Sequence, residues 1–206
     1  MQEVSNKVYK TMAILLQYPN RDLLHCVPEL ESYTGLMPAG KAQRVIANFL
    51  GYLKSEPLLK LQQNYTAAFD MNPSTTLNMT YHLFGDGEKR AGMMVRLQQC
   101  YHAAGYDGPA NDLPDFLPLM LEFLALCPDP SMMDVFWQCF GDLDGLVKRL
   151  REITRPYADL LELLADDYKQ RFKAVVPQPA NGVSRSIKTT PTLIDIGLEK
   201  RWRAVP

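Results

Sequence analysis

The sequence DLPDFLPLMLEFL, at residues 112–124, decides the fold. It places two prolines and two aspartates directly before a run that is apolar on every helical face except at Glu122. A helix that is hydrophobic all round belongs in the interior of a fold, and a lone glutamate in it costs free energy unless it is paired. We therefore expect Glu122 either to be held by an internal cation or to open onto a surface that meets a basic partner.

The two prolines predict the local geometry of this stretch. Pro118 lacks an amide hydrogen and fits best in the first turn of a helix, which predicts Asp115 as the N-cap and residues 116–118 as the first helical positions. Pro114 disfavours a helical conformation at Leu113, because its ring crowds the preceding residue. The sequence therefore predicts a stiff elbow followed by a buried helix.

Acidic residues are expected to line one side of this elbow. Asp112 and Asp115 would flank it, and Glu122 would lie two turns after Asp115 on nearly the same face. A row of acids beside an apolar surface suits an amphipathic partner helix with basic residues. Two alternatives stay open: Asp115 as a purely structural cap, and Glu122 in an internal pair with Arg90 or His82.

Helical periodicity extends outward from the elbow in both directions. Apolar residues recur at three- and four-residue steps, separated by Pro and Gly, and no alternating strand pattern occurs. We expect an all-α single helical bundle of roughly eight to ten helices in residues 1–175, followed by a flexible, Pro-containing tail at residues 176–206. Helices are expected near residues 4–17, 28–35, 41–54, 57–69, 77–85, 87–104, 116–127, 131–140, 143–153 and 156–172, with short turns at 21–26 and 73–76.

Composition excludes several classes of function. Hydrophobic residues make up 47% and charged residues 22% of the 206 residues, and the net charge of −1 provides no field to recruit nucleic acid or an anionic membrane. The longest apolar runs are too short to span a bilayer, and four widely separated cysteines are typical of free thiols in a reducing compartment. We therefore expect a cytoplasmic protein that binds no nucleic acid and does not insert into membranes.

Motifs for catalysis or metal binding are missing from the sequence. It contains no phosphate-binding glycine loop, no nucleophile elbow and no paired Glu-x-x-His of the kind that holds two irons in helical bundles. The three histidines, His25, His82 and His102, have no ligand spacing to one another. The sequence predicts a protein that is not an enzyme and has no metal site.

Four segments together resemble a known family. They are Tyr65-x-x-x-Phe69-Asp70, Leu77-x-x-x-Tyr81-His82-x-x-Gly85-Asp86-x-x-x-Arg90, Tyr101-x-x-x-Gly105, and the Leu-Pro-Asp-Phe-Leu-Pro-Leu-x-Leu-Glu-Phe-Leu run of residues 113–124. This pattern is similar to that of the respiratory nitrate reductase assembly chaperones of the NarJ type, within the wider group of molybdoenzyme maturation chaperones. Two departures stand out: Arg90 is followed by Ala91 where the family has glycine, and Asp112 replaces glutamate.

The resemblance implies a helical, non-catalytic chaperone. Its partner would be the apo catalytic subunit of nitrate reductase, bound through its N-terminal segment, with molybdenum cofactor biosynthesis proteins as further possible partners. It would hold that subunit competent for insertion of molybdopterin guanine dinucleotide and for membrane docking, without stably binding a cofactor itself. The alternative from a different class is a helical scaffold or regulatory module that binds another amphipathic helix.

The resemblance and the charge pattern together define a set of expected partner-binding residues. They are Tyr65, Phe69, Tyr81, His82, Asp86, Arg90, Asp112, Pro114, Asp115, Leu117, Pro118 and Glu122.

Overall fold

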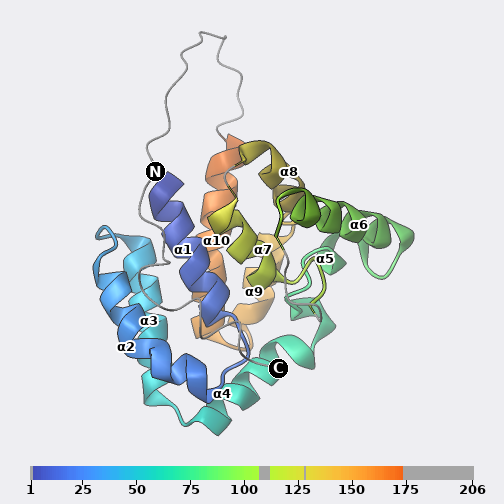
Figure 1. Cartoon of the computed structure of the whole chain (residues 1–206). Coiled ribbons are helices and arrows are strands. Elements are labelled where there is room, and N and C mark those ends of the chain that lie inside the picture. The colour runs from blue at the N-terminus through green and yellow to red at the C-terminus, as the bar shows by residue number, and fades with distance from the viewer. Residues whose placement is uncertain (1, 107–111, 128, 174–206) are drawn as a thin grey trace. The chain divides into compact units, whose positions relative to one another are not determined.

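The computed structural model describes residues 2–106, 112–127 and 129–173. These residues form ten α-helices, one π-helical turn and one 3₁₀ turn, which confirms the predicted all-α fold (Figure 1). The predicted tail at residues 176–206 lies outside the described residues. The elements are α1 (Gln2–Leu15), α2 (Arg21–Gly35), α3 (Lys41–Ser55), α4 (Leu58–Tyr65), the π turn η1 (Thr66–Asp70), the 3₁₀ turn η2 (Pro73–Thr75), α5 (Tyr81–Phe84), α6 (Glu88–Ala103), α7 (Leu117–Leu126), α8 (Pro130–Gln138), α9 (Leu143–Arg151) and α10 (Arg155–Lys173).

Helix α2 is one continuous helix, where the sequence predicted a turn and a second short helix. The Asn20 side chain accepts a hydrogen bond from the amide of Leu23 at 2.8 Å and so caps the helix well before Pro28. Leu23, Val27 and Leu30 then bury one face of this helix on both sides of the proline. The burial of that continuous face outweighs the amide lost at Pro28, so the predicted break was wrong.

A turn was predicted at residues 73–76, where η2 lies, but the helix predicted to follow it from Leu77 to Gly85 was wrong. The chain forms η2, then runs through residues 76–80 without helix, and resumes only at the short α5. Asn72 stabilises the first turn, since its side chain accepts from the Ser74 amide at 3.1 Å. The apolar residues of this segment face the core in a non-helical conformation. The spacing of apolar residues alone does not distinguish such a segment from a short helix.

Helix α7 lies at the centre of the bundle, as predicted. It packs against α1 and α8, and in Figure 1 it is surrounded by other helices. Only three of its residues, Glu122, Ala125 and Leu126, are not fully buried. Its buried residues are Leu117, Pro118, Leu119, Met120, Leu121, Phe123 and Leu124.

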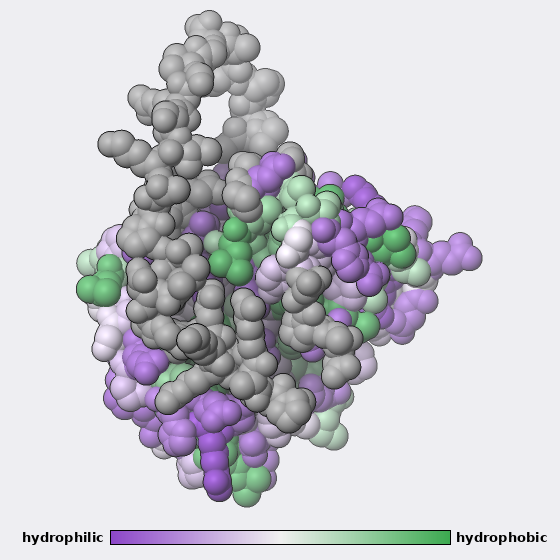
Figure 2. Space-filling view, in the orientation of Figure 1, coloured by the Kyte–Doolittle hydropathy of each residue, from purple (hydrophilic) through white to green (hydrophobic). Residues whose placement is uncertain are grey.

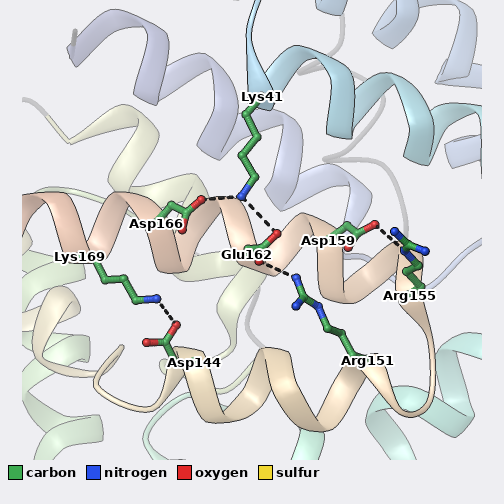
Figure 3. A network of polar contacts seen from close by, with 8 residues as sticks. All are labelled: Lys41, Asp144, Arg151, Arg155, Asp159, Glu162, Asp166 and Lys169. Atoms are coloured by element: carbon green, nitrogen blue, oxygen red, sulfur yellow. Dashed lines mark hydrogen bonds and ion pairs between the residues drawn. The ribbon is translucent and has the colours of Figure 1, made fainter.

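Core aromatics join α3, η1 and α10, and surface ion pairs join α3 and α9 to α10. The Tyr157 ring lies 5.0 Å from the rings of both Phe49 and Phe69. Figure 3 shows Lys41 of α3 bridging two carboxylates of α10, at 3.2 Å from Glu162 and 2.7 Å from Asp166. Such exposed pairs contribute little free energy, so the aromatic packing provides most of the stability here. None of the described helices combines the length and the apolarity that crossing a bilayer requires.

Candidate functional site

The elbow before α7 is built as a tight turn. The Phe116 amide donates to the Leu113 carbonyl at 2.9 Å, and the helix begins at Leu117 with Pro118 as its second residue. The N-cap is Phe116, with no side-chain capping bond, so the prediction of Asp115 as N-cap was wrong. The reason is that the Asp115 side chain turns away from the helix and into the interior.

A short backbone pairing holds the elbow against the non-helical segment at residues 76–80. The Met79 amide donates to the Asp115 carbonyl at 2.9 Å, and the Leu117 amide donates to the Leu77 carbonyl at 2.9 Å. Asn78 and Phe116 form an antiparallel bridge between these two bonds. The two segments that carry the sequence signature therefore meet directly, although they are far apart in the chain.

Asp115 is the centre of a buried polar cluster. Its carboxylate and the Thr80 side chain are both fully buried, and the Thr80 hydroxyl donates to Asp115 Oδ2. Arg90 approaches from α6, with its Nη2 atom 3.5 Å from the same oxygen and its Nε atom donating to Thr80 Oγ1 at 3.3 Å. A buried carboxylate requires such partners, because its desolvation is otherwise not compensated.

Arg90 links this buried cluster to the surface. Its Nη1 atom donates to Oδ1 of Asp86 at 2.7 Å, and the Asp86 side chain is 77% exposed. The guanidinium carbon also lies 5.6 Å from the centre of the Tyr81 ring. The structure thus brings Tyr81, Asp86, Arg90 and Asp115 together.

His82 belongs to a neighbouring polar group on the other side of α5. Its Nε2 atom is 2.8 Å from the Thr76 carbonyl, and its Nδ1 atom is 3.4 Å from Nη2 of Arg149. Burial lowers the pKa of His82, and the positive charge of Arg149 lowers it further, while the bond to Thr76 opposes the shift. A neutral His82 that donates from Nε2 and accepts at Nδ1 satisfies both contacts.

Glu122 has a partner that the sequence did not indicate. The Tyr106 hydroxyl lies close to its carboxylate, and neither Arg90 nor His82 forms a pair with it. Burial raises the pKa of Tyr106 first, and the charges of Glu122 and Asp112 raise it further, so both carboxylates lie close to this phenol. Glu122 is half-buried on the exposed stripe of α7, which places it at the surface and not below it.

Tyr65 and Phe69 are core residues in this structure. They are 4% and 5% exposed, and their rings lie 4.9 Å apart in an edge-to-face arrangement. The Tyr65 hydroxyl donates to the Leu16 carbonyl at 3.1 Å. Both residues therefore support the fold from inside in the described state.

The predicted residues divide into a buried and a surface group. Tyr65, Phe69, Asp115, Leu117 and Pro118 are buried. The residues that reach the surface wholly or in part are Tyr81, His82, Asp86, Arg90, Asp112, Pro114 and Glu122. Figure 2 shows that the surface over α6, beside this second group, is mainly hydrophilic with scattered apolar residues.

Thr80, Tyr101 and Tyr106 contribute to the site but were not predicted. The Thr80 hydroxyl donates to Asp115, and the Tyr101 hydroxyl donates to the Pro114 carbonyl at 3.0 Å. Tyr106 lies close to Glu122. Two of them could have been indicated by their positions in the sequence: Tyr101 is part of the family pattern, and Thr80 directly precedes Tyr81 of that pattern. Within the described ranges, no group of His, Cys, Asp or Glu side chains could hold a metal ion.

Residues 37–135 match the family described as the nitrate reductase delta subunit, so the match spans the whole elbow and its polar cluster. NarJ of Bacillus subtilis, named as a nitrate reductase molybdenum cofactor assembly chaperone, is 26% identical over 156 residues, which cover 76% of this chain and 85% of that protein. The chain is thus similar to the NarJ-type assembly chaperones. NarJ of Escherichia coli, which carries the same description, is 29% identical over 154 residues, or 73% of this chain and 64% of the longer relative.

A solved structure supports the fold independently. The crystal structure of a redox enzyme maturation protein from Archaeoglobus fulgidus is similar with a TM-score of 0.55 and 19% identity, over 82% of this chain and 93% of that one. NarJ-type proteins are chaperones for cofactor assembly and not enzymes, which confirms the expectation of a non-catalytic protein.

Proposed function

We propose that this protein is an assembly chaperone for the catalytic subunit of a nitrate reductase. It binds the N-terminal segment of the apo subunit and holds that subunit competent for insertion of molybdopterin guanine dinucleotide and for docking to its membrane partner. The cofactor is cargo for the client and is not bound stably by the chaperone. The observation that carries the proposal is the family match over residues 37–135, which contains the elbow and its polar cluster.

The surface beside the elbow has the chemistry to bind a basic amphipathic helix. The carboxylates of Asp112 and Glu122 both lie near the Tyr106 hydroxyl, since the charge of each raises its pKa. The Asp112 side chain is half-buried, and this burial raises the pKa of its carboxyl group. Leu113 and Leu126 are 44% and 43% exposed and offer apolar contacts next to these acids. An amphipathic segment with one or two Lys or Arg residues would match both features.

Binding of the client segment is tested by calorimetry with the full chain and a synthetic peptide. The peptide carries the N-terminal residues of the catalytic subunit that is encoded with this chaperone, and a scrambled peptide serves as reference. The double variant Asp112→Asn and Glu122→Gln should bind about three- to tenfold more weakly, because two surface charges are lost from the interface. The loss should shrink at high salt, since the charges are solvent-accessible.

A matched control separates local contacts from net charge. Glu29→Gln with Glu152→Gln removes two exposed carboxylates from α2 and from the end of α9, away from the elbow. This control should bind the peptide like the unmodified chain. Absence of binding by a folded unmodified chain would overturn the proposal and favour a helical scaffold with another partner helix. Equal binding by both double variants would remove Asp112 and Glu122 from the interface.

A further inference from the structure

The buried carboxylate of Asp115 has fewer hydrogen-bond donors than it can accept. Its Oδ2 atom accepts from the Thr80 hydroxyl and lies 3.5 Å from Arg90 Nη2. Its Oδ1 atom is buried and has no hydrogen-bond partner among the described residues. An ionised carboxylate has about four acceptor positions, and leaving one oxygen unsatisfied in the interior is costly. The Asp115 carboxylate can therefore accept further hydrogen bonds from a second cationic group.

Arg90 is an imperfect partner for this carboxylate. A guanidinium can bind both oxygens of a carboxylate with two parallel hydrogen bonds, but Arg90 reaches only Oδ2, at the long distance of 3.5 Å. Its short contact, 2.7 Å, is with Asp86 at the surface. The Arg90 side chain is 17% exposed, so it lies between the buried acid and the solvent. An outward rotation would keep its bond with Asp86 and free the space next to Asp115.

We propose that Asp115 and Thr80 form a subsite for one basic side chain of the client segment, which Arg90 fills in the free chaperone. This inference rests on the proposed function. When the client binds, its basic side chain takes the place of the Arg90 guanidinium, and Arg90 moves outward and stays paired with Asp86. Asp115 is paired in both states, so the exchange never leaves a bare charge in the interior.

The chemistry of the subsite favours a guanidinium over other ligands. The fully buried charge there is negative, and its unsatisfied atom is an acceptor, which excludes an anionic ligand. A planar guanidinium can satisfy Oδ1 and Oδ2 together, whereas an ammonium acts as a point charge. Arg90 thus acts as an internal competitor that lowers the affinity for clients that lack a suitably placed basic residue.

The test compares Arg90→Gln with the unmodified full chain in calorimetry against the client peptide. A second peptide carries citrulline at each arginine and acetyl-lysine at each lysine, which removes charge and retains shape. Arg90→Gln should bind the basic peptide about fivefold tighter or more, because the internal competitor is gone. It should show no gain for the neutral peptide. Arg96→Gln, an exposed change on the same helix, is the matched control for net charge and should leave both affinities unchanged.

A second variant keeps the test decisive if Arg90→Gln is poorly folded. Arg90→Lys retains the positive charge beside Asp115 but lacks the fork that reaches both Asp86 and Thr80. Arg90→Lys should fold, and its affinity for the basic peptide should rise by a smaller factor than that of Arg90→Gln. Unchanged or weaker binding by folded Arg90→Lys would overturn the exchange while the proposed function stands. An equal gain in Arg96→Gln would overturn it too, whereas failure of the unmodified chain to bind at all would count against the proposed function.

Discussion

The Thr80 hydroxyl donates a hydrogen bond to the Asp115 carboxylate across 35 positions of sequence, and both side chains are fully buried. This bond, with the neighbouring Arg90, joins the segment at residues 76–80, helix α6 and the elbow into one unit. The elbow that carries the family signature is therefore held in place by buried contacts. The residues of the elbow that reach solvent are positioned by residues that do not.

The first prediction concerns this anchor. Asp115→Ala should lower the free energy of unfolding by about 3 kcal/mol, because it leaves the Thr80 hydroxyl and a largely buried Arg90 guanidinium without their partner. Asp86→Asn removes the other carboxylate that Arg90 contacts, and should cost no more than about 1 kcal/mol since Asp86 is exposed. Urea unfolding followed by circular dichroism measures both. Similar losses for the two variants would contradict the buried anchor.

A second prediction compares two tyrosines of the aromatic core. The hydroxyl of Tyr157 is buried and has no hydrogen-bond partner within the described part of the chain, whereas that of Tyr65 binds the Leu16 carbonyl. Tyr157→Phe should therefore be neutral or stabilising, because it removes an unsatisfied polar atom. Tyr65→Phe should cost about 1 kcal/mol. Thermal unfolding of both variants tests the difference, and a loss at Tyr157 as large as at Tyr65 would point to an internal donor or a trapped water there.

The helical spacing of apolar residues in the sequence was sufficient to predict that α7 is a central helix. The run from Leu117 to Leu126 is apolar on every face, and the structure surrounds it with other helices. The same reasoning failed at Pro28 and at residues 76–80. In both places tertiary contacts override local preference: a buried face continues through the proline, and backbone pairing with the elbow replaces helix.

The site was predicted less completely, because its decisive contacts are long-range. Asp115 is a good N-cap candidate by position, and nothing in the local sequence shows that Thr80 competes for its carboxylate. The internal cation that was one of two expectations for Glu122 is not found among the described residues, and Glu122 lies instead beside Tyr106, just after the end of α6. Spacing along a chain reports which residues share a helix face, and it says nothing about which loops meet in space.

A third prediction uses two glycines with opposite conformational requirements. Gly51 lies inside α3, and an added Cβ there would meet no atom within 4 Å. Gly51→Ala should stabilise the protein by about 0.5–1 kcal/mol, because alanine loses less backbone entropy in a helix. Gly105 follows α6 at a φ of 65°, so Gly105→Ala should destabilise by about 1 kcal/mol. Urea midpoints of the two variants should move in opposite directions.

The last prediction concerns pH and His82. Its pKa in the folded protein is lowered, chiefly by burial and further by Arg149, so the unfolded chain takes up a proton at a higher pH than the folded chain does. The contribution of neutral His82 is fully present above the unfolded pKa of about 6.5. It is lost as the pH falls through the folded value. Stability should therefore decrease between about pH 7.5 and pH 5, where the unfolded state binds more protons.

The variant His82→Gln isolates this contribution. Glutamine can donate to the Thr76 carbonyl in place of Nε2 but does not titrate, so the decrease in unfolding free energy on acidification should be smaller than in the unmodified chain. His25→Gln, at an exposed position of α2, should leave the decrease unchanged. Urea unfolding at several pH values gives the slopes. If His82→Gln and the unmodified chain lose stability in parallel, then folding does not lower the pKa of His82, which would contradict the effect of burial and of Arg149 on it.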